Sequence, residues 1–369
     1  MSIFVFALVI TILLPMILRK CNVDNKQKNI YLYIIFGILI IISGLRAVSV
    51  GIDSNSYFNE FLGFKYTNLS DIIQNSPMDI GYIIYSYIVY IIIGNIQGIF
   101  LISSILISIG FGYWMYKYSE HIVISMLLYI VLIFPVTMNI MRQSIAMAFI
   151  LLAISMVHSK NLRKAIIFEI IAICFHMSAA IFIPVLFFSK RRTKIGKSIL
   201  FLGTLAGIIG IALGPKLIEI FVQIFPRYAQ LLLYSNFTRG EDVSTILLIA
   251  YGVLGLVTFI FIIIEKKTQD SEIEIISYAM FICFFVCYYL SKSIVIVQRI
   301  KYYFIASLLI LVPFVLGKFL NTSKVGSRCI YFVIECGLIG IGIYFYKQDG
   351  QGLLPFLFYW QEGDRKSVV

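Results

Sequence analysis

Long apolar runs separated by short polar stretches dominate the chain, and this pattern indicates membrane-spanning helices. A transmembrane helix needs about 20 predominantly apolar residues, or fewer where the bilayer is locally thin. The runs predict spans at residues 3–18, 30–45, 96–116, 121–138, 141–158, 163–175, 177–189, 195–213, 244–264, 273–290, 300–317 and 328–346. A further apolar segment, 80–94, is expected to form a short or re-entrant helix. The pattern therefore predicts an all-α polytopic membrane protein with about 11 to 14 membrane segments.

The charged residues between these runs indicate the orientation of the chain. Lysine and arginine concentrate in short loops on the cytoplasmic side of a membrane protein. Such clusters lie at 19–28, 160–164, 190–197, 265–267 and 318–324. One assignment places all of them in the cytoplasm, and the outer side then receives 46–79, 139–142, 176, 215–243, 291–299 and the C-terminal tail. This assignment needs an odd number of crossings between 80 and 116, so we expect segment 80–94 not to span the membrane.

The two longest outer loops, 46–79 and 215–243, do not resemble plain linkers. Both mix charged and apolar residues, as do amphipathic helices that lie along a membrane surface. The chain has no separate polar segment long enough for a soluble functional domain. We therefore expect a single integral membrane domain over residues 1–369, with amphipathic helices in the outer loops and the chemistry on the membrane part.

The composition agrees with this class of protein and removes one alternative. Of the 369 residues, 60% are hydrophobic and 13% are charged, whereas soluble domains have about 45–50% apolar and about 25% charged residues. The net charge of +12 would also suit a nucleic-acid-binding protein. The basic residues lie in the short clusters that the topology already explains, so no nucleic-acid partner is expected.

A smaller set of ionisable residues lies near the outer ends of the spans, where the topology does not explain them. Ionisable groups near membrane depth are costly and usually face a polar cavity, so each is a candidate for function. The set comprises Arg46, Asp53, Glu60, Arg142, His176, Arg227, Arg239 and Arg299. Several arginines on one leaflet favour a site for a phosphate or diphosphate headgroup, because the planar guanidinium binds phosphate oxygens in pairs and keeps its charge.

The candidates differ in the chemistry that they offer. Arg142 and Gln143 at the outer start of a helix suit an anionic group, which the helix N-terminus also favours. His176 lies at the turn between two short apolar helices and suits a general base. Asp53 suits the same role, or the orientation of the arginines. The outer face has no DxD pair and the chain no glycine-rich nucleotide loop, which disfavours a nucleotide-sugar donor with a divalent metal.

Each candidate also has an ordinary structural explanation. Arg142 and Arg299 fit arginines whose charged heads reach from the membrane to the interface. Asp53 in an Asx turn would cap a helix that begins near Asn55. A lone histidine on an apolar face, such as His176, often serves a structural role. These alternatives stay open at the level of the sequence.

Four stretches together resemble the EpsG-like, Wzy-type polysaccharide polymerases. They are Arg46 with VGIDSNSY (50–57), NIMRQSIAMAF (139–149), CFHMSAAIFIP (174–184) and QRIKYYFIASLLILVP (298–313). The stretches occur in the order of the family and extend over residues 46–313. One departure is Ile52, which precedes Asp53 where the family more often has a Thr-Asp-Thr pattern. The aspartate is kept, but no role is carried over for the flanking hydroxyls.

The resemblance implies an all-helical membrane fold similar to that of the GT-C glycosyltransferases, which use lipid-linked sugars. It implies a polymerase that transfers a growing glycan from an undecaprenyl-diphosphate carrier to the terminal sugar of a second lipid-linked repeat unit. The product would be O-antigen, capsule or exopolysaccharide, and no metal or other cofactor is implied. The implied location is the bacterial inner membrane, with an extracytoplasmic active site. The implied partners are the undecaprenyl-diphosphate-linked donor and acceptor, membrane lipids and, as a candidate, a chain-length regulator.

The resemblance also assigns roles to the candidate residues. Arg46, Arg142 and Arg299 would hold the donor diphosphate and stabilise its charge as it leaves. His176 or Asp53 would accept the proton of the attacking sugar hydroxyl. The remaining substrate-binding candidates are Gln143, Arg227, Arg239, Tyr57 and Tyr303. The tyrosines would stack on sugars or donate hydrogen bonds to them, and their alternative is the aromatic belt of a membrane interface.

Other classes of function compete with a polymerase. A lipid-linked oligosaccharide flippase or another transporter would place its site near the bilayer midplane between repeated halves, whereas the candidate charges here lie near one surface. An O-antigen ligase would use the same arginine and histidine chemistry with a different acceptor. A membrane acyltransferase is a further alternative.

Overall fold

The computed structural model of the chain describes residues 1–17, 25–186, 244–264, 271–291, 295–320 and 325–362, with positions 205 and 216. These residues form helices and turns and no strand; one isolated bridge pairs Arg46 with Phe358. The prediction of an all-α protein is confirmed. The predicted span 195–213 and the outer loop 215–243 lie outside the described residues, apart from those two positions.

The chain divides into two compact units, which are described separately. Unit 1 comprises Met1–Ser189 and Thr322–Val369, and unit 2 comprises Lys190–Asn321. The expectation of a single integral membrane domain stays a prediction.

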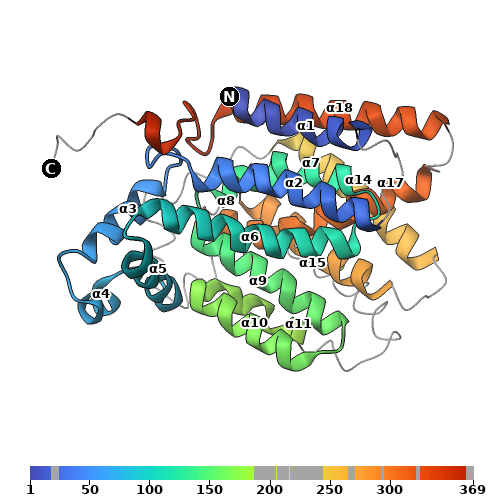
Figure 1. Cartoon of the computed structure of the whole chain (residues 1–369). Coiled ribbons are helices and arrows are strands. Elements are labelled where there is room, and N and C mark those ends of the chain that lie inside the picture. The colour runs from blue at the N-terminus through green and yellow to red at the C-terminus, as the bar shows by residue number, and fades with distance from the viewer. Residues whose placement is uncertain are drawn as a thin grey trace. The chain divides into compact units, whose positions relative to one another are not determined.

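Unit 1 contains most of the described helices (Figure 1). They are α1 (Ser2–Ile17), α2 (Asn25–Gly44), α3 (Ser54–Gly63), α4 (Leu69–Asn75), α5 (Ile80–Ile93), α6 (Ile96–Tyr118), α7 (Ile122–Leu128), the π-helical turn η1 (Tyr129–Ile133), α8 (Phe134–Thr137), α9 (Met141–His158), α10 (Leu162–Phe175), the 3₁₀ helix η2 (Met177–Phe182), α11 (Ile183–Leu186), α18 (Val325–Gln348) and the 3₁₀ helix η5 (Tyr359–Gln361). Unit 2 contains α14 (Thr245–Ile264), α15 (Ser271–Leu290), α16 (Val295–Phe304), the 3₁₀ turn η4 (Ile305–Ser307) and α17 (Leu308–Phe319).

Seven of the described helices are long and apolar enough to cross a membrane. They are Gln27–Gly44, Ile96–Tyr118, Met141–His158, Thr245–Ile264, Ile273–Leu290, Val297–Phe319 and Val325–Gln348. Shorter apolar helices cover Ser2–Pro15, Ile80–Ile93, Ile122–Thr137 and Met177–Leu186. The prediction of a polytopic membrane protein is confirmed, and the helices follow the apolar runs closely.

Helices α2 and α6 run antiparallel and define the two ends of unit 1. At one end the Ser104 hydroxyl donates to the Ser43 hydroxyl at 2.8 Å, and at the other the Lys28 ammonium donates to the Ser119 carbonyl at 3.0 Å. Close packing along this part of the bundle needs small residues, because a Cβ on Gly110 of α6 would lie 2.5 Å from the Cβ of Ala148 on α9. The end at which α2 finishes and α6 begins is called the site face below.

Helix α5 begins and ends on the site face. Asp79, just before α5, forms an ion pair with Arg142 at the start of α9. At the other end of α5, Gly94 has a left-handed φ of 68° and closes the helix, because its N–H donates to the Val89 and Tyr90 carbonyls. Asn95 then caps α6 through its side chain. Both ends of α5 thus lie at the site face. That α5 does not cross the membrane stays a prediction.

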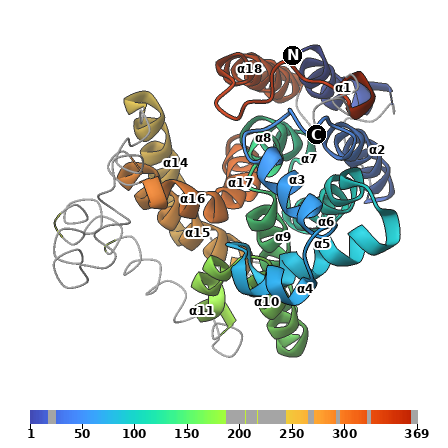
Figure 2. The same ribbon diagram turned by 90° about the vertical axis from the view of Figure 1, so that its left-hand side faces the viewer.

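The outer loop 46–79 is helical, as predicted, and supports α5. Phe64 and Ile72 from this loop form an apolar cluster with Ile83 of α5. Tyr87 and Tyr90 of α5 pack on the same cluster. Figure 2 looks onto the site face and shows α3, α4 and α5 over the ends of the longer helices of unit 1. The loop therefore forms an ordered layer that fixes the start of α5.

The path of α5 predicts the side of the membrane from which an impermeant reagent labels each of its flanking loops. In a chain whose six native cysteines are replaced by serine, Asn68→Cys and Asn95→Cys are expected to react with an impermeant maleimide from the same side. Lys164→Cys, near the opposite end of α10, is expected to react from the other side. If Asn95→Cys reacted from the same side of the membrane as Lys164→Cys, α5 would cross the membrane.

Candidate active site

Arg142 lies at an electrostatically unfavourable position that a nearby carboxylate corrects. It is the second residue of α9, where the helix dipole disfavours a cation. Its Nη1 donates to Asp79 Oδ2 at 2.8 Å, and the two side chains are 20% and 19% exposed. The carboxylate therefore stabilises the guanidinium at the positive end of the helix.

His176 meets the same carboxylate from a different element. The chain turns sharply at His176, between α10 and η2, with φ −158° and ψ 111°. The His176 Nδ1 lies 3.0 Å from Asp79 Oδ2, and the Met177 N–H donates to Asp79 Oδ1 at 3.1 Å. Asp79 thus joins the start of α9 to the α10–η2 corner.

The position of Asp79 depends on close packing at the start of α5. Asp79 is the N-cap residue of α5, but its side chain makes no capping hydrogen bond and points to the partners described above. Gly81 allows α5 to approach α10 closely, because a Cβ there would lie 2.6 Å from the Cys174 carbonyl oxygen. A larger residue at this position would push Asp79 away from His176.

The environment keeps Asp79 ionised. Burial raises the pKa of Asp79, but the hydrogen bonds from His176 and Met177 and the charge of Arg142 outweigh it, so the net pKa lies below the usual range. The stabilisation from this ionised carboxylate is present at neutral pH and is lost only as the pH falls through the lowered pKa. An ionised carboxylate only accepts hydrogen bonds, so Nδ1 of His176 must carry the proton in this contact. In the neutral imidazole, Nε2 then carries the lone pair.

Two aromatic rings border the arginine of this cluster. The Arg142 guanidinium lies 5.9 Å from the ring centre of Tyr82, which is 5.5 Å from the ring centre of Tyr57. Tyr57 is 4% exposed, and burial raises its pKa, an effect that Arg142 opposes and Asp53 reinforces. Gln143 is also on α9 and is 3% exposed. The structure thus places the predicted residues Tyr57, Arg142 and Asp53 near one another.

The side chain of Arg46 is buried, and its guanidinium donates hydrogen bonds to backbone carbonyls rather than facing solvent. It is 1% exposed; Nη1 donates to the Ser43 carbonyl at 2.6 Å and Nη2 to the Met138 carbonyl at 2.9 Å. Its guanidinium lies 3.9 Å from the ring centre of Phe100. Burial lowers the pKa of Arg46 to about 10, which still leaves a cation at neutral pH. These contacts favour a structural role, and its predicted role as a substrate ligand stays a prediction.

Asp53 is fixed by its backbone while its side chain takes no part in capping. It precedes α3 as the N-cap residue, without a side-chain capping bond. Its N–H donates to Asn139 Oδ1 at 3.4 Å, and the Asn139 amide donates to the Gln351 carbonyl at 2.7 Å. Gly51 has φ 99°, and a Cβ there would lie 2.8 Å from Asn139 Oδ1. The expected Asx cap is therefore absent at this position, which leaves the alternatives of base and orienting group for Asp53.

The other predicted residues belong to unit 2 or lie outside the described residues. Arg299 is exposed on α16 of unit 2, and Tyr303 of the same helix is 2% exposed. Arg227 and Arg239 lie outside the described residues. Their roles stay predictions.

Asp79 is the central residue of the cluster, and the sequence analysis did not single it out. It sits in SPMDIGY, where an aspartate before an apolar helix resembles an ordinary N-cap. The usable signal was its position: an acidic residue at the start of a segment predicted not to cross the membrane is expected at the same level as Arg142 and His176.

The fold and this cluster define a polytopic membrane protein with an arginine, a histidine and an aspartate joined at one face. A family model described as the EpsG family matches residues 29–358. The chain therefore belongs to the EpsG family, and at the family level it is a Wzy-like polysaccharide polymerase of the membrane. Searches of curated proteins and of solved structures give no match.

The packing at Gly81 predicts a variant that disturbs the cluster without touching its charges. Gly81→Ala places a methyl group against the Cys174 backbone, so α5 must shift and Asp79 must move away from His176. Polymer formation in cells is expected to fall at least about tenfold while the protein still inserts. Gly37→Ala is the matched control, because a Cβ there meets nothing within 4 Å. Equal polymer from the two variants would contradict the importance of this packing.

The burial of Arg46 predicts a loss of stability on its removal. Arg46→Met leaves the Ser43 and Met138 carbonyls without their donors, and a buried unsatisfied group costs about 1–3 kcal/mol. The midpoint of thermal unfolding in detergent is expected to fall, whereas Arg163→Met, at an exposed position, should leave it unchanged. Unchanged stability with lost activity would instead support Arg46 as a substrate ligand.

Proposed function

We propose that the protein polymerises oligosaccharide repeat units carried on undecaprenyl diphosphate. The growing glycan moves from its lipid diphosphate to the terminal sugar of a second lipid-linked unit. The observation that carries this proposal is the shared carboxylate of Asp79, which holds Arg142 and His176 in one cluster. An anion-binding cation and a proton acceptor are the two groups that glycosyl transfer from a diphosphate requires.

Arg142 stabilises the leaving diphosphate in this proposal. Its guanidinium has five N–H donors in a planar fork, and one of its nitrogens contacts Asp79. The fork matches phosphate oxygens, and the start of α9 adds backbone N–H groups and a positive dipole. The negative charge that develops on the diphosphate oxygen as the sugar–oxygen bond breaks is thus met by a fixed positive charge.

His176 takes the proton of the acceptor. The acceptor hydroxyl oxygen attacks the anomeric carbon of the donor, the bond from this carbon to the phosphate oxygen breaks, and the diphosphate leaves with the bonding electrons. The hydroxyl proton passes to Nε2 of His176. Asp79 holds the opposite ring nitrogen at 3.0 Å, which fixes the tautomer and stabilises the imidazolium once it forms.

The remaining predicted residues have supporting roles in this proposal. Asp53 is the alternative base. Arg299, Arg227 and Arg239 are further ligands for the diphosphate, and Gln143, Tyr57 and Tyr303 contact the sugars. Arg46 positions the loop that leads into α3, because its guanidinium joins the end of α2 to the turn before α9.

The proposed location is the bacterial plasma membrane, with the site face on the extracytoplasmic side. Lys28 at the start of α2 and the cluster at 160–164, which lie at the opposite end of unit 1, support this orientation. A chain-length regulator is a candidate partner on the same side.

A comparison of arginine variants tests the diphosphate role. Arg142→Ala and Arg142→Lys are both expected to lower polymerisation by about 10²–10³, because a lysine lacks the planar fork. The measurement uses purified protein in vesicles with lipid-linked repeat units and separates the products by gel electrophoresis. Arg163→Ala, on the exposed start of α10, is the control and should give normal ladders.

Two outcomes would overturn the proposal in different ways. Normal ladders from both Arg142 variants would remove the diphosphate assignment. A wild-type protein that moves the lipid-linked units across the vesicle membrane without elongating them would be a transporter. Normal turnover by His176→Gln would leave Asp53 as the base.

A further inference from the structure

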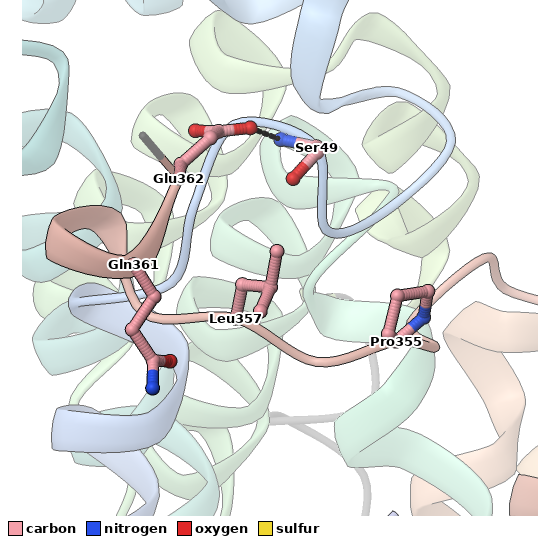
Figure 3. A pocket seen from close by; sticks show the side chains of 5 residues that line it. All are labelled: Ser49, Pro355, Leu357, Gln361 and Glu362. Carbon is pink, nitrogen blue, oxygen red and sulfur yellow. Dashed lines mark hydrogen bonds between the residues drawn. The ribbon is translucent and has the colours of Figure 1, made fainter. Parts of the chain in front are cut away.

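A cavity of about 340 Å³ lies on the site face, apart from the Asp79 cluster. It is lined by Ser49 from the loop after α2 and by Pro355, Leu357, Gln361 and Glu362 from the segment after α18 (Figure 3). Its volume is at the lower end of the range of small-ligand sites. The hydroxyl, amide and carboxylate groups and the apolar side chains of Pro355 and Leu357 give it both polar and apolar surface.

The walls of this cavity are held together by hydrogen bonds between distant parts of the sequence. The Glu362 carboxylate accepts from the Val48 N–H at 3.0 Å and from the Ser49 N–H at 2.9 Å. The Ala47 N–H donates to the Leu357 carbonyl at 2.9 Å. The cavity is therefore fixed by contacts between its two walls, and a ligand would meet a preformed site.

Exposed aromatic rings precede the cavity wall in the sequence. Tyr359 is 46% exposed and Trp360 is 58% exposed, and both belong to η5, whose last residue, Gln361, lines the cavity. The Trp360 ring is stacked on Phe358, with ring centres 4.6 Å apart and an interplanar angle of 6°. The stack fixes the orientation of a large aromatic surface at low entropic cost.

We propose that this cavity and the Trp360 ring form a binding subsite for a sugar residue of the glycan. A pyranose ring has hydroxyl groups around its edge and C–H groups on its faces. Ser49, Gln361 and Glu362 suit the hydroxyl edge, while Leu357 and Pro355 suit the apolar face. The exposed Trp360 ring, next to Gln361 in the chain, offers a further apolar surface. The subsite rests on the proposed function, because its ligand is the polymer that the protein extends.

The position of the subsite suits a role in holding the glycan during extension. Its wall at Ser49 belongs to the loop that Arg46 fastens to Met138, four residues before Arg142. Asn139, in the turn before α9, binds Gln351 at the start of the segment that forms the other wall. Both walls are therefore tied to the turn that leads into Arg142.

Equilibrium binding without turnover tests the subsite. The probe is a set of tritium-labelled oligosaccharides of one to four repeat units, cut from the polysaccharide of the cells that make the protein. The whole protein is held in lipid nanodiscs and dialysed against each oligosaccharide. Trp360→Ala and Ser49→Phe, which fills the cavity, are each expected to raise the Kd at least about tenfold, equivalent to about 1.4 kcal/mol. Tyr344→Ala, which removes an exposed ring of α18, is the control and should bind as the wild type does.

Fluorescence adds a readout that is specific to this place. The chain has two tryptophans, and Trp114 is fully buried in α6, so an emission change on adding oligosaccharide reports on Trp360. A saturable change supports the subsite. Quenching of Trp360 by brominated lipid chains, with no effect of oligosaccharide, would show a membrane anchor and overturn it.

The outcome separates this proposal from the proposed function. If the protein binds the oligosaccharides but forms no glycosidic linkage, the subsite is supported and the polymerase mechanism is contradicted. If the protein polymerises, but its Trp360→Ala and Ser49→Phe variants bind the oligosaccharides as tightly as the wild type does, only the subsite is contradicted.

Discussion

The carboxylate of Asp79 accepts hydrogen bonds from a helix start and from a helix corner that are far apart in the sequence. It meets Arg142 at 2.8 Å, His176 at 3.0 Å and the Met177 N–H at 3.1 Å. Near a membrane, an unpaired charge at this depth is unfavourable, so the ionised carboxylate and the guanidinium stabilise each other. The same contacts that make the charges tolerable also fix the geometry of a cation and a proton acceptor. Stability and proposed chemistry therefore depend on one carboxylate.

Two arginines on this face show how burial separates structure from chemistry. Arg46 is 1% exposed and directs its nitrogens at backbone carbonyls and at an aromatic face. Arg142 is 20% exposed and contacts the Asp79 carboxylate, with the Tyr82 ring and the start of α9 beside it. A guanidinium whose donors are used by the protein holds loops together. One that keeps access to solvent is suited to a phosphate.

The sequence predicted the helices well because each follows from a continuous apolar run and from the loops that carry lysine and arginine. That both ends of α5 lie at one face agrees with the topology, which needed an odd number of crossings between 80 and 116. Asp79 was not predicted, because an aspartate before an apolar helix has a common explanation as an N-cap. Its partnership with Arg142 and His176 depends on the close contact of Gly81 with Cys174. This contact joins residues that are more than 90 positions apart in the chain. Nothing in local sequence indicates such a contact.

The central claim is that Asp79 and His176 act as one unit during glycosyl transfer, and a double-mutant cycle tests it most directly. Single-turnover rates are measured in vesicles with lipid-linked repeat units for wild type, Asp79→Asn, His176→Gln and the double variant. Groups that act as a unit show strongly non-additive effects. The account predicts that the loss in the double variant is much smaller than the product of the two single losses, because part of the Asp79→Asn loss acts through His176. Two losses that multiply in the double variant would show that the residues act independently and would contradict the account.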